Sequence, residues 1–399
     1  MSTGFRSLFL LSFAMVVGVM GTALISPLYG LYQEAWHLQT VEVSLIYVVY
    51  MGGALSALLF FGRLPDVLGF KATLAWALGA IWVGTLVSML AWNTVSLSVG
   101  RFIVGAASSM ITTSASLGFL HVAPPEKRIR MAMLSSILMA FGFGVGPLVG
   151  GILGQWAPWP LVTTYLPTLV LALLGIAGLR KVQVHPHDGA AAQRRAARWA
   201  DIVPKLTWPA REDTGALVLT CALPFVAFGV FGLYASMLPL FLDKMIPWHG
   251  PMVSGTALAL LLFGSSGFQL VARRISVRWC GFVGLMALAA SNAMLLANLL
   301  AASTLLFFSG VLLTALGHAL CMLAGMTMVN KIATPDNRSG LLATYLVVGY
   351  VGSMAPMLGI GWIADRWGMN VALGCFCGAV VVTGSVAAWR FKAHPRTGA

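Results

Sequence analysis

The chain has 399 residues, of which 59% are hydrophobic and only 9% are charged. A soluble domain carries roughly 25% charged residues, so this composition excludes an ordinary soluble protein and indicates a surface that faces lipid. The formal net charge is +13, but the basic residues lie in short segments between apolar runs and form no basic helix or patch, which argues against a nucleic-acid partner.

Twelve apolar runs follow one another along the chain, each near the roughly 20 residues that cross a hydrocarbon core. Six begin near residues 8, 43, 71, 96, 131 and 160, and six more near 215, 252, 282, 304, 341 and 371. Between the sets lies a basic, alanine-rich stretch with a short helical candidate, Ala190–Ile202. We predict an all-α membrane protein: an N-terminal six-helix bundle over 1–180, a cytoplasmic linker over 181–213 and a C-terminal six-helix bundle over 214–399.

The distribution of basic residues predicts the orientation. With the N-terminus inside, the inner segments hold 21 lysines and arginines and the outer loops hold two, Lys244 and Arg366. Cytoplasmic loops carry such an excess, and tryptophans gather at the interfaces. Six tryptophans fall at predicted outer helix ends: Trp36, Trp92, Trp156, Trp159, Trp248 and Trp367. We therefore expect a multi-pass protein of a bacterial-type inner membrane with both termini in the cytoplasm.

The two sets of runs are related as an internal repeat. Three proline pairs recur at offsets of 212, 210 and 209: Pro27 with Pro239, Pro125 with Pro335, and Pro147 with Pro356. Many secondary transporters consist of such repeats, with the substrate site between the halves near the bilayer midplane. The repeat therefore predicts two pseudo-symmetric bundles around a central site.

The segment between the second and third runs contains a motif. Its glycines permit a tight turn, and its aspartate can accept bonds from a neighbouring helix N-terminus and pair with a basic group. It reads Gly62-Arg-Leu-Pro-Asp66-Val-Leu-Gly69-Phe-Lys71. The pattern resembles the loop 2–3 signature of the major facilitator superfamily, although Val67 and Phe70 replace the usual basic residues. The resemblance implies a latch that keeps the outward-facing state shut on the inside; the alternative is an ordinary tight turn.

The fifth run contains a second motif, in which glycines at four-residue spacing permit close helix approach and a proline permits a kink. It reads Gly142-Phe-Gly-Val-Gly146-Pro147-Leu-Val-Gly150-Gly151. The pattern matches every fixed position of the antiporter signature of the same superfamily. The resemblance implies an exporter, whereas the alternative is a glycine-rich packing helix.

Arg101 lies within the fourth run, where a charge costs at least about 2.5–3.5 kcal/mol and marks a candidate functional residue. Snorkelling to the outer surface is the alternative. The segment resembles the superfamily's helix 4 motif, whose arginine is linked to proton transfer, with Val104 in place of a common glutamine. Gly21 and Pro27-Leu-Tyr-Gly30 resemble the helix 1 signature of twelve-helix drug:proton antiporters. The chain is thus identified as a superfamily member of the drug-antiporter type.

The candidate substrate and coupling residues are polar side chains within apolar runs. The first, seventh and eighth runs contain no aspartate or glutamate, so we expect a neutral or anionic amphipathic substrate. Proton coupling needs a side chain that titrates, and Glu42 and His318 are the candidates. The charge of histidine changes near neutral pH. An interfacial acid and a histidine bonded to a neighbouring carbonyl are the alternatives. The further candidates for substrate contact are Tyr47, Tyr50, Tyr234, Gln269 and Asn292. For each of them the alternative is a hydrogen bond between helices.

The function we predict is export of a small molecule by proton antiport with alternating access, and the alternative is uptake or facilitated diffusion of a small metabolite. An enzyme would need a convergent nucleophile, base or metal cluster, and the sequence shows none. No pore repeat indicates a channel, and no Walker motif indicates direct use of ATP. We expect no cofactor, no metal and a monomer, with a small-molecule substrate, protons and the lipid bilayer as partners.

Overall fold

The computed structural model describes residues 3–62, 64–122, 125–183, 206–334 and 337–398. Within these ranges the regular structure is helical and no strand occurs. In the described part of the chain, twelve helical segments are long and apolar enough to cross a membrane, and each begins within about five residues of its predicted start. The all-α membrane fold is therefore confirmed. The predicted helix Ala190–Ile202 lies outside the described residues.

The chain divides into two compact units. Unit 1 comprises Met1–Ile25 and Val49–Val203, and unit 2 comprises Ser26–Val48 and Pro204–Ala399. Residues 26–48 thus pack with unit 2, although they lie early in the sequence. The predicted limits at residues 180 and 214 remain a prediction.

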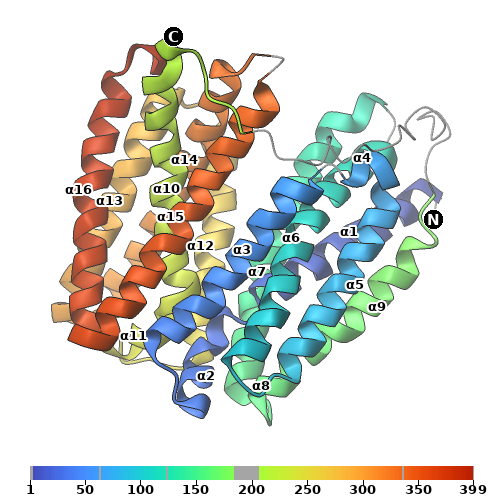
Figure 1. Cartoon of the computed structure of the whole chain (residues 1–399), viewed down its shortest axis with the longest axis horizontal. Coiled ribbons are helices and arrows are strands. Elements are labelled where there is room, and N and C mark those ends of the chain that lie inside the picture. Colours follow the sequence, from blue (N-terminus) through green and yellow to red (C-terminus); the bar gives the residue numbers. More distant parts are fainter. Residues whose placement is uncertain (1–2, 63, 123–124, 184–205, 335–336, 399) are drawn as a thin grey trace. The chain divides into compact units, whose positions relative to one another are not determined.

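Unit 1 is a helical bundle in which α1 packs against α6, α7 and α9, and α5 packs against α6 and α9 (Figure 1). The short elements α4 and η2 connect successive spans, and α8 begins the sixth span. In chain order the elements are α1 (Thr3–Ala23), the part of α3 (Thr40–Phe61) that follows Val48, α4 (Leu64–Leu68), α5 (Phe70–Met89), α6 (Thr94–Val122), η2 (Pro125–Lys127), α7 (Arg128–Trp156), α8 (Pro160–Thr163) and α9 (Leu166–Leu179).

In unit 2, α13 packs against α14 and α16, α10 packs against α14 and α15, and α12 packs against α14 (Figure 1). The elements are η1 (Ser26–Leu28), α2 (Tyr29–Trp36), the first part of α3, η4 (Arg211–Asp213), α10 (Thr214–Gly232), the π-helical turn η5 (Leu233–Met237), α11 (Leu238–Phe241), η6 (Leu242–Lys244), α12 (Pro251–Ala272), α13 (Val277–Ala301), α14 (Thr304–Ile332), α15 (Arg338–Trp367), α16 (Met369–Ala393) and η7 (Pro395–Thr397).

Large apolar side chains lie on the outside of the helices. Trp76 is 71% exposed, Leu305 81% and Leu300 93%. Soluble monomers rarely leave large contiguous apolar surface uncovered, whereas lipid removes this cost. The surface therefore fits the membrane class that the composition predicted.

The first and seventh spans are both interrupted. Phe5–Trp36 consists of α1, η1 and α2, and Arg211–Lys244 contains the π-helical turn η5 between α10 and α11. Proline has no N–H to donate, so Pro27 cannot bond the carbonyl of Ala23, where α1 ends. Pro239 likewise cannot bond Ala235, which lies in the π-helical turn. Interrupted helices at corresponding positions of two repeats are the strongest sequence-level indication of a transport site.

Candidate functional site

The glycine motif of α7 forms a close contact with α1 inside unit 1. A Cβ on Gly142 would lie 2.9 Å from the carbonyl oxygen of Val16, and one on Gly146 would lie 2.5 Å from that of Met20. A Cβ on Gly150 would overlap the carbonyl oxygen of Leu24. Both rows advance by four residues, so one glycine stripe faces one stripe of backbone that runs along α1 to Leu24, just past its end. Pro147 lies inside α7 beside the stripe, and Gly151 is buried.

The loop motif between α3 and α5 contains the turn that its glycines predict. Gly69 has φ +81°, a value that side chains rarely adopt, and precedes the first residue of α5. The Nζ of Lys71 donates to the carbonyl of Val182, which ties α5 to the end of α9. Gly62 is a turn residue directly after α3, and Asp66 is exposed in α4. Within the described residues Asp66 has no hydrogen bond to a helix N-terminus, so its latch role remains a prediction.

Arg101 lies in α6 and is only 3% exposed within the structure, so the side chain is buried and does not reach the surface. Its Nη2 donates to the carbonyl of Thr22 at 3.1 Å, and its guanidinium carbon lies 4.3 Å from the centre of the Tyr50 ring. Because α1 ends at Ala23, the Thr22 carbonyl is one of the four that lack a donor within the helix. A cation at this end also complements the helix dipole.

The buried guanidinium is incompletely satisfied. Its Nε has no hydrogen-bond partner, and no carboxylate lies within ion-pair distance among the residues that the structure describes. Removing a charge from water without a counter-ion is costly, so the neighbourhood of Arg101 carries a positive potential. The ring of Tyr50, which is 8% exposed, offsets part of this cost by a cation–π contact.

In unit 2 the first half of α3 lies against α15. The Tyr47 hydroxyl lies 2.6 Å from the Ser353 hydroxyl, and both side chains are buried. Asp365 at the end of α15 accepts hydrogen bonds from the backbone N–H groups of Thr40 and Val41. Sequence patterns could not select Ser353 or the Thr40–Asp365 contact, because the paired residues are more than 300 positions apart in the chain.

Glu42 has a local structural contact. Its carboxylate accepts from the N–H of Gln39 at 2.9 Å, which is the capping-box bond of the first helical turn. Glu42 belongs to unit 2 and Arg101 to unit 1. The cap is a local structural role, and proton coupling through Glu42 remains a prediction.

His318 lies half-buried in α14, where aromatic side chains surround it. Its Nδ1 lies 2.8 Å from the hydroxyl of Ser265 in α12, so its partner is on another helix and is not a carbonyl of its own helix. Its ring centre lies 6.3 Å from that of Phe228 and 5.9 Å from that of Phe231, both in α10. Tyr350 of α15 meets the edge of Phe228 at 5.9 Å. Four helices of unit 2 thus contribute to one cluster of a titratable group and aromatic rings.

The remaining predicted contact residues are also in unit 2. Tyr234 is buried in the π-helical turn, and Gln269 is half-buried near the end of α12. Asn292 is buried in α13, where its Nδ2 donates to the Leu288 carbonyl at 2.8 Å and its Oδ1 has no partner among the residues described. For Asn292 the observed bond is within its own helix.

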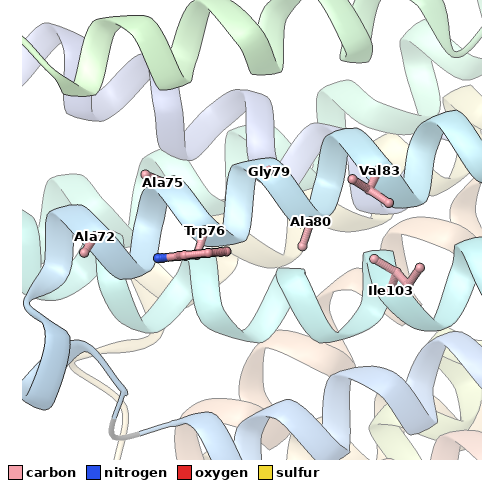
Figure 2. A pocket seen from close by; sticks show the side chains of 7 residues that line it. All are labelled: Ala72, Ala75, Trp76, Gly79, Ala80, Val83 and Ile103. Atoms are coloured by element: carbon pink, nitrogen blue, oxygen red, sulfur yellow. The ribbon is translucent and has the colours of Figure 1, made fainter.

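A groove along the surface of α5 and α6 is lined by none of these candidate residues. Figure 2 shows its lining, in which Trp76 and Val83 of α5 and Ile103 of α6 bound a row of small residues. Its volume is about 610 Å³ and its lining is almost entirely apolar. The exposed Trp76 identifies it as surface that faces lipid, without the convergent polar groups that a specific substrate site needs.

These features define a multi-pass membrane transporter with interrupted helices. A model of the Major Facilitator Superfamily matches residues 11–281, and the chain belongs to that family. It is 27% identical to the methylenomycin A resistance protein of Streptomyces coelicolor over 250 residues, which are 58% of this chain and 50% of that protein. It is 28% identical to the uridine/deoxyuridine transporter of Lactococcus lactis over 137 residues, which are 34% of this chain and 28% of that protein. The chain thus spans half or less of the length of these relatives.

Two solved structures share the fold. A bacterial homologue of the human lysosomal transporter Spinster has a TM-score of 0.72 at 16% identity and aligns over 98% of this chain and 96% of its own. A mutant of the nucleoside transporter NupG has a TM-score of 0.72 at 13% identity and aligns over 97% of this chain and 100% of its own. At these identities the likeness concerns the fold alone.

Proposed function

We propose that this chain exports small amphipathic organic molecules in exchange for protons by alternating access. The observation that carries the proposal is the contact of Gly142, Gly146 and Gly150 with α1, because the residues of the antiporter signature form one continuous packing stripe. The stripe joins α7 to the interrupted first span, so a movement of one is transmitted to the other. The resistance protein among the relatives supports export.

The charge around Arg101 supports a neutral or anionic substrate. The described part of unit 1 supplies no carboxylate to this guanidinium, so the local potential favours anions and disfavours lipophilic cations. Tyr50 covers one face of the guanidinium and leaves the charge in place. We infer that Arg101 acts through this potential, because the side chain is itself almost fully buried.

For proton coupling we favour His318 over Glu42. His318 is half-buried and contacts side chains from two other helices, whereas Glu42 caps the first turn of its own helix. A change of charge on His318 alters a cluster that joins α10, α12 and α14, so it can bias their arrangement. Phe228, Phe231 and Tyr350 supply apolar surface for an amphipathic substrate beside it.

A second candidate is uptake of a small metabolite by symport or facilitated diffusion. The likeness to a protein named as a uridine/deoxyuridine transporter favours it. The glycine stripe disfavours it, since by resemblance that stripe marks exporters.

The proposal also covers the membrane, the orientation of the chain, its oligomeric state and its partners. We place the protein in a bacterial-type inner membrane with both termini in the cytoplasm, because 21 of its basic residues then lie inside. It acts as a monomer that transports a small molecule rather than as an enzyme, with no nucleic acid, cofactor or metal.

Efflux from cells tests export and charge selection together. Cells that express the chain are loaded with carboxyfluorescein, an anion, or with ethidium, a cation, and the loss of each dye is followed against cells with empty vector. We expect accelerated loss of carboxyfluorescein that a protonophore abolishes, and no acceleration for ethidium. Vigorous ethidium efflux would contradict the charge selection, and efflux that survives the protonophore would contradict proton coupling.

A further inference from the structure

The end of α15 holds the beginning of α3 through one carboxylate. Within unit 2, Oδ1 of Asp365 accepts from the N–H of Thr40 at 2.7 Å, and Oδ2 accepts from the N–H of Val41 at 2.9 Å. Thr40 and Val41 are the first two residues of α3, so their N–H groups have no acceptor within the helix. A carboxylate at this position gains two charge-assisted bonds and the favourable end of the helix dipole.

Close packing continues from this carboxylate along both helices. Gly361 lies one turn before Asp365, and a Cβ there would lie 2.7 Å from the Cα of Val41 and would overlap the Ser44 hydroxyl. Further along, the Tyr47 and Ser353 hydroxyls are 2.6 Å apart. The contact therefore extends over two turns of α3, with the aspartate at its outer end and a buried hydroxyl pair at its inner end.

The neighbouring charged side chains are engaged elsewhere. Glu42 accepts from Gln39 at the same helix start, and Arg366 places its guanidinium carbon 4.3 Å from the centre of the Trp362 ring. Among the described residues Asp365 has no ion pair. Its negative charge is thus compensated by the N-terminus of α3, and removal of that charge weakens the contact directly.

We propose that Asp365 is a positioning residue of the transport cycle that latches α3 to α15 on the outer side. The inference rests on the proposed function and on the predicted orientation. In the predicted repeat, α3 belongs to the first six spans and α15 to the last six, so alternating access requires these helices to separate at their outer ends once in each cycle.

The accessibility of Ser44 reports the state of the latch. Its side chain is buried, and its hydroxyl contacts the Thr40 carbonyl and the Met237 sulfur. A Ser44→Cys variant, made with Cys375→Ser to remove the exposed native thiol, is treated on whole cells with a membrane-impermeant maleimide. The same protein without Ser44→Cys gives the background from the four buried cysteines.

Asp365→Asn is compared with Asp243→Asn, which removes the same charge from an exposed residue in η6 on the same predicted side. The asparagine keeps one acceptor but turns an NH₂ group toward the second N–H of α3. We expect Asp365→Asn to label roughly three- to tenfold faster, Asp365→Glu to fall between it and the parent, and Asp243→Asn to match the parent.

Equal labelling of Asp365→Asn and the parent, or equal acceleration by Asp243→Asn, would overturn the proposal. If Asp365→Asn does not fold, as judged by size-exclusion and thermal midpoint, Tyr47→Phe tests the inner end of the same contact. It is expected to accelerate labelling, and unchanged labelling would overturn the proposal. Because labelling needs no substrate, a failed latch is distinguished from a failed export assay.

Discussion

At the residue scale, the proposed function rests mainly on the side chains of Arg101 and His318, which have different kinds of partner. Arg101 is buried in unit 1 with a carbonyl and an aromatic face as partners, and its Nε lacks a bond among the described residues. His318 has a hydroxyl partner and two aromatic neighbours, Phe228 and Phe231, and Tyr350 in turn contacts Phe228. The sequence selected both because ionisable groups are rare in apolar runs. It could not select Thr22, Ser265 or Ser353, which are ordinary polar residues until the fold brings them to their partners.

Arg101→Met is expected to abolish selective export while the fold survives. Loss of the cation–π contact and of the helix cap costs about 1–3 kcal/mol, but relief of a buried unpaired charge offsets that cost. We expect a thermal midpoint within a few degrees of the parent and at least a roughly tenfold slower loss of carboxyfluorescein. Arg101→Lys keeps the charge without the planar group and should retain part of the activity. Full activity in Arg101→Met would show that export does not require the charge of Arg101.

His318→Phe separates titration from packing. Phenylalanine keeps a ring beside Phe228 and Phe231 but cannot change charge or bond the Ser265 hydroxyl. We expect export driven by a pH gradient to be lost while exchange of substrate for substrate, measured without a gradient, continues. Ser265→Ala is the companion variant, which removes the hydroxyl partner and leaves the imidazole in place. If gradient-driven export is unchanged in His318→Phe, His318 is not the group that couples transport to protons.

At the element scale, the sequence predicted the twelve spans and the tight turn of the loop motif, but not the detailed break in the seventh span. Length and apolarity define a span almost without reference to the rest of the chain. A π-helical turn such as Leu233–Met237 depends instead on how neighbouring helices accept the extra residue. The glycine stripe of α7 was predicted to pack closely, and the structure identifies its partner as α1.

Gly150→Ala is expected to destabilise the contact between α7 and α1. The new methyl group would overlap the carbonyl of Leu24, and such overpacking costs about 1–3 kcal/mol. Gly79→Ala in α5 is the matched control, because a Cβ there meets nothing within 4 Å and alanine favours a helix. Thermal unfolding in detergent should therefore show a lower midpoint for Gly150→Ala only. Equal midpoints would mean that the stripe is not a tight contact.

At the scale of the whole molecule, the chain is a twelve-span member of the Major Facilitator Superfamily whose contacts group residues 26–48 with the later part of the chain. The sequence could not predict this grouping, since hydropathy gives each span but not the neighbours of its two ends. The proline offsets indicated a repeat, and the interruptions near Pro27 and Pro239 lie at one such pair. Export is a proposal that rests on the resemblance of the glycine motif to the antiporter signature, and the direction of transport can be measured directly.

The most direct test measures carboxyfluorescein entering proteoliposomes that contain the purified chain, with the dye quantified after lysis at one fixed pH. A proton antiporter should take up the dye when the lumen is more acidic than the medium, since outward proton flow drives inward substrate flow. Empty liposomes and a protonophore set the background. Uptake driven by the opposite gradient, with the medium more acidic than the lumen, would identify a symporter and contradict the account.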